Sequence, residues 1–365
     1  MFSVKVELKD NAYEILIGQN CLRDLGKYLL PLKIGRDAIV ITNPIIRRYH
    51  GRAIQAGLKS FDFSVKFIEV PSGERSKSAQ KAFQLIREIA QYSVGRSPFI
   101  VAFGGGVIGD LAGFLAAVYK RGIPFIQVPT TLLAQVDSAI GGKVAVDLPA
   151  GKNLIGAFYQ PRLVFSDVAL LATLNKRQIK NGLAETVKYG IISDRYLFHY
   201  LETQRAPLLS LHLSVMTEAV LACSRIKARV VAADEKETKG IRTILNFGHT
   251  IGHAIETANR YRNYHHGEAV ALGMRVAAEI SRRLGMLADD EAVRIGRLLS
   301  EMGLPKLIQN VSVSEIFECM AFDKKFRAKK NRFVLARSIG SVKVVEDISP
   351  KVIRASIKGF MDKTA

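Results

Sequence analysis

Apolar and polar positions follow two different periods along the chain, and the change between them divides the sequence. Short apolar runs bounded by turn residues predict buried strands in the first half. These runs are Ala38–Thr42, Val65–Val70, Pro98–Phe103 and Phe125–Val128. Between the second and third runs, Ser78–Tyr92 has apolar residues at helical spacing. Strands that alternate with helices predict a mostly parallel sheet covered on both faces.

Longer amphipathic patterns dominate after about residue 170 and predict helices. They cover Lys176–Ile191, Leu211–Asp234, Thr250–Ala258, Glu268–Leu284 and Asp289–Met302. A predicted strand pair, Arg332–Ala336 and Val342–Val345, interrupts them near the end. The sequence therefore predicts an α/β nucleotide-binding domain over residues 1–170 and a mainly α-helical domain over residues 171–365.

Charge is the first compositional feature that changes this picture. The chain has 53 Lys and Arg against 33 Asp and Glu, a net charge of +20. Clustered cations bind nucleic acid by releasing phosphate counterions. Here the excess is spread over both halves without a basic tail, and its densest run is residues 324–332. This distribution favours a basic surface or an anionic small substrate over a nucleic-acid partner.

Composition also limits the class of protein. An apolar fraction of 48% excludes intrinsic disorder. No apolar run reaches the roughly 18 residues that cross a bilayer, and the N-terminus has no signal-peptide pattern, so no membrane partner is expected. The three cysteines form no CxxC pair, which favours a reduced, cytoplasmic protein.

A glycine-rich turn carries the first candidate chemistry. Gly104, Gly106 and Gly109 form GxGxxG between a predicted strand and an apolar helical pattern beginning at Asp110. Glycines there let the chain turn tightly and expose backbone N–H groups to a pyrophosphate. No acidic residue ends a strand about 20 residues later, so the motif departs from the ordinary dinucleotide fingerprint. The pattern favours a nucleotide, and a βα turn without a ligand is the alternative.

Histidines gather in one segment. Four of the seven, His249, His253, His265 and His266, lie between residues 249 and 266. His249 and His253 are four residues apart and face the same way on a helix. Two such imidazoles can bind Zn²⁺ together, or one can bind the metal while the other acts on substrate. The spacing leaves both possibilities open, and surface or core-capping histidines are the alternative.

Charged residues with small or apolar neighbours give further candidates. Glu185 and Lys188 are three apart on a predicted helix whose apolar neighbours predict partial burial. Such spacing is otherwise a solvated ion pair of little consequence. Lys143 follows two glycines, and Lys152 lies between Gly151 and Asn153, where an anion can reach the ammonium. Ordinary polar loops are the alternative for both lysines.

Taken together, these motifs resemble the 3-dehydroquinate synthase family of the sugar-phosphate cyclase superfamily. The resemblance extends over Gly104–Asp110, Arg121–Ser138, Gly141–Pro161, Gly182–Gly190, Arg242–Glu256 and His266–Met274. Its most specific strings are Gln127–Ser138 and Asn246–His253. It implies a Rossmann-like N-terminal domain and a mainly helical, metal- and substrate-binding C-terminal domain, working as a homodimer.

The resemblance also implies an activity. The family converts 3-deoxy-D-arabino-heptulosonate 7-phosphate to 3-dehydroquinate and phosphate, a carbon–oxygen lyase reaction of the shikimate pathway of aromatic amino-acid biosynthesis. Transient oxidation by tightly held NAD⁺, phosphate elimination, reduction and aldol cyclisation follow one another at a divalent metal, usually Zn²⁺ and alternatively Co²⁺. A sister sugar-phosphate cyclase, an NAD- and metal-dependent polyol dehydrogenase and a nucleic-acid-binding protein are the alternatives.

Matching positions give the implied site. The metal ligands are Glu185, His249 and His266, and His253 is placed near the substrate phosphate instead. Substrate contacts fall on Asp137, Lys143, Asn153, Lys188, Lys227, Arg242 and Asn246, with Lys152 and Lys325 close by. Arg121 is implied to reach the phosphate site of the neighbouring subunit. Cofactor contacts fall on Gly105, Gly106, Val107, Asp110, Thr130 and Thr131, joined by Asn43, Glu74, Lys77, Lys143 and Lys152.

Overall fold

The computed structural model describes residues 1–260, 262–322 and 331–362. The chain forms two compact units. The first contains residues 1–175 and 216–236, and the second contains residues 176–215 and 237–365. The boundary after Asn175 lies close to the one that the sequence predicts, but residues 216–236 are a difference that is described below.

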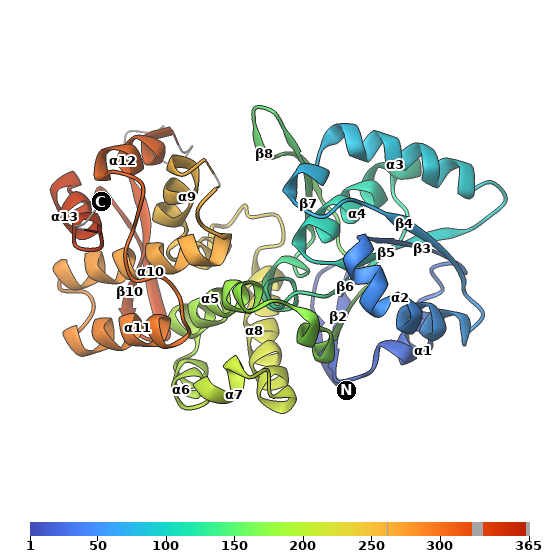
Figure 1. Cartoon of the computed structure of the whole chain (residues 1–365), viewed down its shortest axis with the longest axis horizontal. Helices are drawn as coiled ribbons and strands as arrows, with labels where there is room; N and C mark the ends of the chain where they lie inside the picture. The colour runs from blue at the N-terminus through green and yellow to red at the C-terminus, as the bar shows by residue number, and fades with distance from the viewer. Residues whose placement is uncertain (261, 323–330, 363–365) are drawn as a thin grey trace. The chain divides into compact units, whose positions relative to one another are not determined.

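The first unit is built on a seven-stranded sheet (Figure 1). Its order is β1 (Phe2–Val6), β2 (Tyr13–Gly18), β9 (Leu163–Asp167), β6 (Phe125–Pro129), β5 (Pro98–Gly104), β3 (Asp37–Thr42) and β4 (Ser64–Glu69). Only the β1–β2 pair at one edge is antiparallel, and every other neighbouring pair in this sheet is parallel. The predicted, mostly parallel sheet is confirmed.

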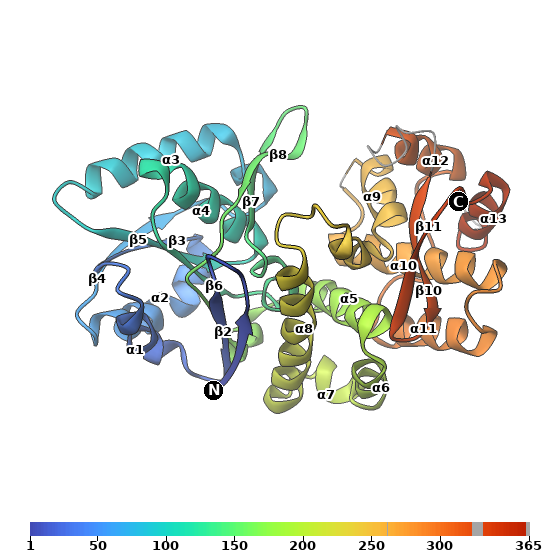
Figure 2. The same cartoon turned by 180° about the vertical axis from the view of Figure 1, so that it is seen from behind.

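Helices cover both faces of this sheet (Figure 2). Along β3, Val40 packs into the core under α1 (Leu25–Leu29) and α2 (Pro44–Lys59). Its neighbour Ile41 points the other way, into the core under α3 (Ala79–Tyr92) and α4 (Gly106–Val118). Because successive side chains of a strand face opposite sides, burial on both faces requires the continuous apolar runs seen in the sequence.

A hairpin that the sequence did not predict follows the sheet. Strands β7 (Lys143–Leu148) and β8 (Gly151–Phe158) pair antiparallel. Val144 and Val146 of β7 are buried, whereas β8 is exposed along almost its whole length. A Cβ atom on Gly113 of α4 would lie 2.3 Å from Cγ1 of Val144, so glycine allows the hairpin to pack on this helix.

Helix α8 (Leu213–Ala233) lies in the predicted second domain, but most of it belongs to the first unit. Residues 216–236 group with the first unit, although the sequence places them in the second domain. Side-chain hydrogen bonds explain the grouping: Gln19 Nε2 donates to Thr217 Oγ1 at 2.9 Å, and Gln160 Nε2 donates to Glu235 Oε1 at 3.1 Å. An amphipathic pattern shows that a helix buries one face, but not which neighbour covers it.

The second unit is mainly helical, as predicted. Its helices are α5 (Lys176–Ser193), α6 (Arg195–Thr203), α7 (Arg205–Leu209), α9 (His249–Ala258), α10 (His266–Arg283), α11 (Asp289–Glu301), α12 (Val313–Phe322) and α13 (Pro350–Lys358). The predicted strand pair is confirmed as the antiparallel hairpin of β10 (Arg332–Ser338) and β11 (Ser341–Glu346).

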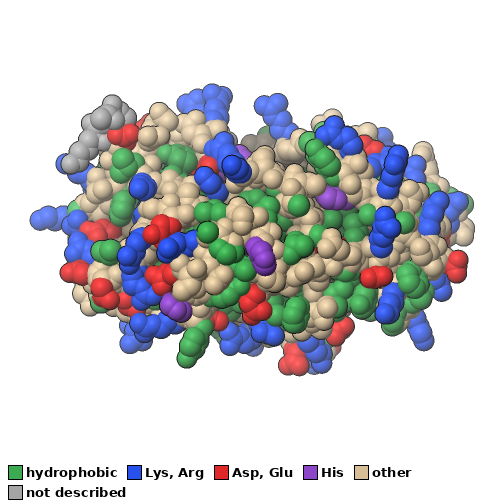
Figure 3. Space-filling model, turned by 60° about the horizontal axis from the view of Figure 1, so that its bottom comes forward, with side chains coloured by type: hydrophobic (Ala, Val, Ile, Leu, Met, Phe, Trp, Pro, Cys, Tyr) green, Lys and Arg blue, Asp and Glu red, His purple; other side chains and the backbone are tan. Residues whose placement is uncertain are grey.

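The surface agrees with a dispersed positive charge. On the face shown in Figure 3, Lys and Arg side chains are interspersed with Asp and Glu and do not gather into one continuous stripe. Among the described residues, no helix has the length and apolar character needed to cross a membrane.

Candidate active site

The carboxyl ends of β3 and β5 are a topological switch point, the kind of position at which α/β sheets bind nucleotides. These strands are parallel neighbours, but β3 leads to α2 on one face and β5 leads to α4 on the other. Ligands of open α/β sheets bind where successive connections leave in opposite directions. Asn43, which follows β3, caps α2 by accepting a hydrogen bond from the Ile46 N–H at 2.9 Å. Its side chain therefore stands at this edge.

The glycine turn has the predicted strand–turn–helix context. Gly105 precedes α4 in an extended conformation, with φ −77°, so a positive φ is not the reason for glycine here. A Cβ atom on Gly105 would lie 3.0 Å from Cγ2 of Thr131, which shows how closely the β6 end approaches. The Thr130 N–H also donates to the Gly104 carbonyl at 3.0 Å. The edge thus brings together Gly105, Gly106, Val107, Thr130 and Thr131 at a helix N-terminus, which attracts anions.

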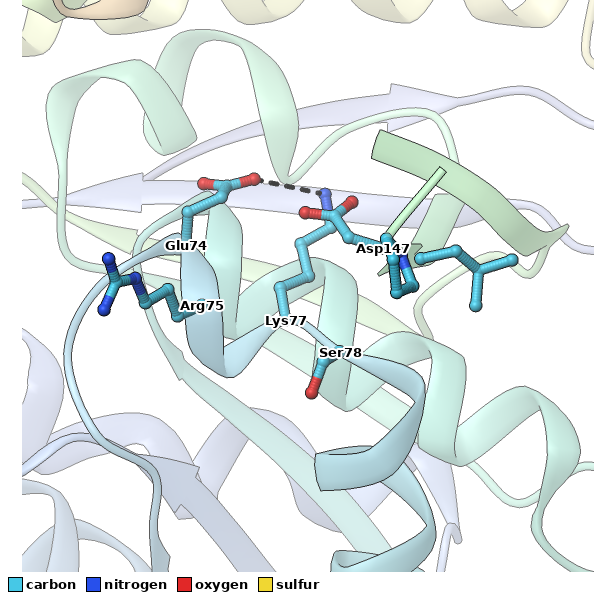
Figure 4. Close-up of a pocket in the computed structure, with 7 residues that line it drawn as sticks. Glu74, Arg75, Lys77, Ser78 and Asp147 are labelled. Carbon is cyan, nitrogen blue, oxygen red and sulfur yellow. Dashed lines mark ion pairs between the residues drawn. The ribbon is translucent and has the colours of Figure 1, made fainter. Parts of the chain in front are cut away.

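A buried lysine, Lys77, joins three segments beside this edge, and Figure 4 shows its ion pair with Glu74. Lys77 is 4% exposed, and its Nζ lies 2.6 Å from Oδ2 of Asp110 and 4.0 Å from Oε1 of Glu74. It also donates to the side chain of Asn153 in β8. The Nζ of Lys152 lies 3.9 Å from the same Glu74 oxygen. A pocket of about 330 Å³ adjoins this network, lined by Glu74, Arg75, Lys77, Ser78, Asp147, Leu148 and Pro149.

Replacing Lys77 by Met should destabilise the protein in a pH-dependent way. Burial raises the pKa of Asp110, and the charge of Lys77 opposes that rise. Without Lys77, the folded state holds the Asp110 proton more tightly than the unfolded state, so stability falls as pH rises. We expect a loss of about 2 kcal/mol at pH 8 and a smaller loss at pH 5.

Denaturant unfolding at both pH values measures this loss. The matched control is Lys81→Met, because the ammonium of Lys81 donates at 2.8 Å to the exposed side chain of Gln84. An equal loss at pH 5 and pH 8 for the Lys77 variant would contradict the assigned role of Asp110.

Two other predicted substrate contacts of the first unit also form an ion pair. Lys227 of α8 is 6% exposed and binds Asp137, donating to its carboxylate and, at 2.6 Å, to its carbonyl oxygen. Lys143 lies at the other end of the β7–β8 hairpin from Asn153, about 16 Å away along the strands. The structure therefore gathers Asp137 with Lys227 and Lys77 with Asn153, as two separate groups of the first unit.

Arg121 lies apart from these groups. It follows the last turn of α4, whose first turn carries the glycine edge, so the helix separates them by about 18 Å. Arg121 is exposed and has a φ of 64°, in the left-handed region. Its own chain thus places Arg121 away from the nucleotide edge.

The second unit contains a buried carboxylate facing two imidazoles. Glu185 of α5 is fully buried, and its Oε1 lies 3.6 Å from Nε2 of His249 and 3.6 Å from Nε2 of His266. Donors of a tetrahedral ion about 2.1 Å from the metal are about 3.4 Å apart. A carboxylate and two imidazoles are also a donor set that Zn²⁺ accepts. These residues therefore fit one small divalent ion.

The other ring nitrogens of these histidines face separate acceptors. Nδ1 of His249 lies 3.2 Å from the Phe247 carbonyl oxygen, and Nδ1 of His266 lies 3.3 Å from Oε2 of Glu256. Both contacts leave Nε2 directed toward Glu185. Glu256 is a site residue that the sequence analysis missed, although it is seven residues after His249 and so on the same helical face.

The two histidines differ in their affinity for a proton. Burial lowers the pKa of His249 well below its usual value. Burial also opposes a proton on His266, but hydrogen bonds to Glu185 and Glu256 outweigh it and raise the pKa of His266 to about 10. In the metal-free site, His266 therefore holds a proton between two carboxylates, and a cation replaces that charge.

His253 lies beside this cluster. The donor nitrogens of His249, His253 and His266 all lie within 4.8 Å of one another, so three imidazoles could also hold an ion. His253 is exposed, whereas His249 is buried. The geometry alone admits His253 as a ligand or as a neighbouring acid–base group, the same two possibilities that the helical spacing left open.

The remaining predicted substrate contacts of the second unit lie close to the Glu185–His249–His266 cluster in sequence or on the same helix. Lys188 is 1% exposed and forms an ion pair with Glu185 one turn away on α5. Arg242 and Asn246 are in the turn of residues 241–246 that leads into α9. Arg242 is buried, with Nε 3.4 Å from Oε1 of Glu237. The predicted Lys325 lies outside the described residues.

Close contact between α9 and α10 fixes these side chains. A Cβ atom on Gly273 would lie 1.9 Å from the Gly248 carbonyl oxygen, and one on Gly252 would lie 3.0 Å from Cα of Val270. Gly248 itself has a φ of 80°. Gly248, Gly252 and Gly273 thus serve helix packing, which brings His249 on α9 next to His266 on α10.

Gly273→Ala should therefore cost about 3 kcal/mol of unfolding free energy, because backbone atoms must move to admit the methyl group. Gly296→Ala in α11 is the matched control: its Cβ would meet only Arg275 Nη1, at 3.5 Å. Alanine at an open helical position should be neutral or stabilising. Urea unfolding of both variants measures the difference, and equal stability would refute the packing argument.

Comparisons with known proteins agree over both units. The 3-dehydroquinate synthase N-terminal model matches residues 67–181, and the 3-dehydroquinate synthase C-terminal model matches residues 182–326. The 3-dehydroquinate synthase of Desulforamulus reducens is 44% identical over 356 residues, covering 97% of this chain and 99% of that protein. That of Geotalea uraniireducens is 45% identical over 351 residues, covering 96% and 97%.

Solved structures share the fold. A 2-deoxy-scyllo-inosose synthase in complex with carbaglucose-6-phosphate, NAD⁺ and Co²⁺ has a TM-score of 0.85 at 28% identity, covering 99% of this chain and all of that one. A 2-epi-5-epi-valiolone synthase from Streptomyces hygroscopicus has a TM-score of 0.88 at 24% identity, covering 97% and 98%. With both family models matched and near full-length relatives above 40% identity, the chain belongs to the 3-dehydroquinate synthase family.

Proposed function

We propose that this chain converts 3-deoxy-D-arabino-heptulosonate 7-phosphate to 3-dehydroquinate and phosphate, as a carbon–oxygen lyase of aromatic amino-acid biosynthesis. The observation that carries this proposal is the buried Glu185–His249–His266 cluster in a chain that belongs to the family. The relatives that match over nearly their whole length are 3-dehydroquinate synthases. The inosose synthase, a sister cyclase, is much less similar, at 28% identity.

Glu185, His249 and His266 would hold one divalent ion, Zn²⁺ or Co²⁺, and NAD⁺ would occupy the glycine edge of the first unit. When bound, the ion polarises substrate oxygens and the nicotinamide accepts and returns a hydride. The chain contributes a buried carboxylate and a buried imidazole, Glu185 and His249, to the metal cluster. Lys188 neutralises the charge of Glu185 from the next turn of α5, and His253 stands beside the cluster, where it can exchange a proton with bound substrate.

The nucleotide would lie against Gly105, Gly106 and Val107, which form the N-terminus of α4, where backbone N–H groups can bind a pyrophosphate. Thr130, Thr131 and Asn43 line the same edge with hydroxyl and amide groups. Glu74, Lys77, Asp110 and Lys152 form the charged network beside it. A carboxylate such as Glu74 suits the hydroxyl groups of a ribose, which donate hydrogen bonds.

The doubly anionic substrate would be held by cations and amides. The proposed contacts are Asp137, Lys143, Lys152, Asn153 and Lys227 in the first unit, and Lys188, Arg242, Asn246 and His253 in the second, joined by Lys325. Arginine binds a carboxylate through two parallel N–H groups, whereas lysine acts as a point charge. We therefore assign the substrate carboxylate to Arg242.

A homodimer is the assembly that we propose. Leu154, Ile155 and Phe158 of β8 are 51%, 39% and 44% exposed, an apolar strand without cover in the single chain. Tyr159 at the end of β8 donates to the Ile123 carbonyl at 2.8 Å, which places this strand beside the Arg121 turn. Contact along β8 would thus bring Arg121 to the partner subunit and away from its own nucleotide edge.

Leu154→Asp should then weaken the dimer at least tenfold, because a charge would be buried in the contact. Sedimentation over a range of protein concentrations gives the dissociation constant. Tyr196→Asp is the control, since Tyr196 is 89% exposed on α6. If the wild-type chain sediments as a monomer at all concentrations, or if the Leu154 variant dimerises normally, this contact is excluded.

The cysteines suit the cytoplasmic location that we propose. Cys21, Cys223 and Cys319 are all free thiols. Thiols persist in reducing compartments, where disulfides are rare.

The decisive experiment is incubation of the purified protein with the heptulosonate phosphate, NAD⁺ and Zn²⁺. We expect one phosphate and one 3-dehydroquinate per turnover, without net NADH. Stoichiometric NADH would instead indicate a polyol dehydrogenase. Turnover of a sugar phosphate that has no carboxylate, with the heptulosonate phosphate left intact, would indicate a sister cyclase.

A further inference from the structure

We infer that Glu256 is a positioning residue for His266: it holds the imidazole in the tautomer and orientation that present Nε2 to the metal site. The inference rests on the proposed function of Glu185, His249 and His266 as the metal ligands. It concerns a residue outside that ligand set, and it predicts metal affinity in the absence of any substrate.

The contact that carries the inference is direct. Oε2 of Glu256 lies 3.3 Å from Nδ1 of His266, while Nε2 of the same ring lies 3.6 Å from Oε1 of Glu185. The two nitrogens of one imidazole thus face two different carboxylates. A neutral imidazole can donate from only one nitrogen. With Nδ1–H given to Glu256, Nε2 keeps its lone pair for a cation.

Burial makes this contact effective. Glu256 is 7% exposed, and it is fixed on α9 by the close packing of that helix against α10. His266 is the first residue of α10, and its side chain is 32% exposed against 10% for His249, so packing alone restrains its ring less. A buried carboxylate at its Nδ1 therefore restricts a ring that the helix itself does not fix.

His249 provides an internal comparison. Its Nδ1 faces the Phe247 carbonyl oxygen at 3.2 Å, a partner that no side-chain substitution removes. Metal-binding histidines usually donate their second ring N–H to a carbonyl or carboxylate, and losing a carboxylate partner commonly weakens metal binding 10- to 100-fold. The site thus has one fixed and one replaceable orienting group, and only the second can be tested by mutation.

The first measurement of this test is the Zn²⁺ affinity of Glu256→Ala and Glu256→Gln. It is made by competition with a chromophoric chelator in the absence of substrate and NAD⁺. We expect Glu256→Ala to raise the Zn²⁺ dissociation constant about 10- to 100-fold. Glu256→Gln keeps an acceptor oxygen of similar shape and should retain part of the affinity. If the alanine variant does not fold, the Zn²⁺ dissociation constant of the glutamine variant still tests the role of Glu256.

Glu291→Gln is the matched control. Glu291 is 8% exposed in the same unit, accepts a hydrogen bond from the Ile339 N–H at 3.2 Å and lies 3.7 Å from Arg195. Its loss should lower stability without changing the Zn²⁺ dissociation constant. A second readout is the ¹⁵N spectrum of the histidines with Zn²⁺ bound, in which loss of Glu256 should shift the Nδ1 signal of His266.

The ligand variants Glu185→Gln and His266→Ala separate the two proposals. If they lose Zn²⁺ while both Glu256 variants bind it as tightly as the wild-type chain, the metal site stands and the role of Glu256 is overturned. If the ligand variants also bind Zn²⁺ normally, the proposed metal site fails, and the inference fails with it. Weaker binding by the Glu291 control as well would assign the effect to stability and overturn the inference.

Discussion

Glu185→Gln should lose the bound metal and lower kcat by about 10³-fold. The carboxylate faces Nε2 of both His249 and His266 at 3.6 Å, and a neutral amide is a far weaker ligand for a divalent cation. Loss of the ion removes several kcal/mol of stabilisation from developing negative charge, which corresponds to this factor. Metal analysis of the purified variant and its steady-state kinetics measure the two effects.

The same substitution should also destabilise the protein. Lys188 is 1% exposed and pairs with Glu185, so Glu185→Gln leaves a buried ammonium without its carboxylate. Breaking a buried pair in this way costs about 3 kcal/mol or more. The double variant Glu185→Gln/Lys188→Met should recover stability but neither metal nor activity. The control is Glu291→Gln, which replaces another buried carboxylate and should retain both metal and activity. A fully metallated and active Glu185 variant would refute the ligand assignment.

Arg242→Lys should raise KM for the heptulosonate phosphate about 10- to 100-fold with a smaller change in kcat. Lysine keeps the positive charge but cannot form two parallel hydrogen bonds to a carboxylate. Each such bond to a charged group is worth about 1.5–3 kcal/mol. Arg242 is 3% exposed, so water does not readily replace the lost N–H donors.

The control for this variant is another buried arginine of the second unit. Arg275 is 6% exposed and donates to the carbonyls of Gly296 and Pro305 and to Oγ of Ser300. Arg275→Lys should cost stability without changing KM. A substrate analogue without the carboxylate should bind equally well to the wild-type chain and the Arg242 variant. Unchanged kinetic constants for Arg242→Lys would exclude the carboxylate assignment.

Much of the fold follows from local patterns. The apolar runs at Ala38–Thr42 and Pro98–Phe103 became β3 and β5, since strands buried on both faces need continuous apolar sequence. The glycine motif lies between β5 and α4, as its sequence context predicted. The hairpin of β7 and β8 was missed because β8 is exposed, and its residues do not alternate between apolar and polar in the way that marks a half-buried strand.

The candidate site was less predictable from residues alone. The spacing of His249 and His253 showed a shared helical face but not which of them binds a metal with Glu185, which is far away in sequence. The resemblance to a known family supplied that assignment. The structure adds that Nε2 of His249 and of His266, each with an acceptor at Nδ1, face the buried carboxylate.

By itself, the sequence determined the alternation of buried strands and helices around the glycine turn, the glycine turn itself and the histidine-rich segment, because each depends on residues that are close together in the chain. The tertiary structure alone decided that residues 216–236 join the first unit, that Lys77 bridges Asp110 and Asn153, and that Glu256 faces His266. These contacts join side chains on different segments, and only the packing of one helix or hairpin on another determines which polar groups meet. The large positive charge gave no such information, since Lys and Arg are interspersed with Asp and Glu on the face shown in Figure 3 and exposed ion pairs contribute little to stability.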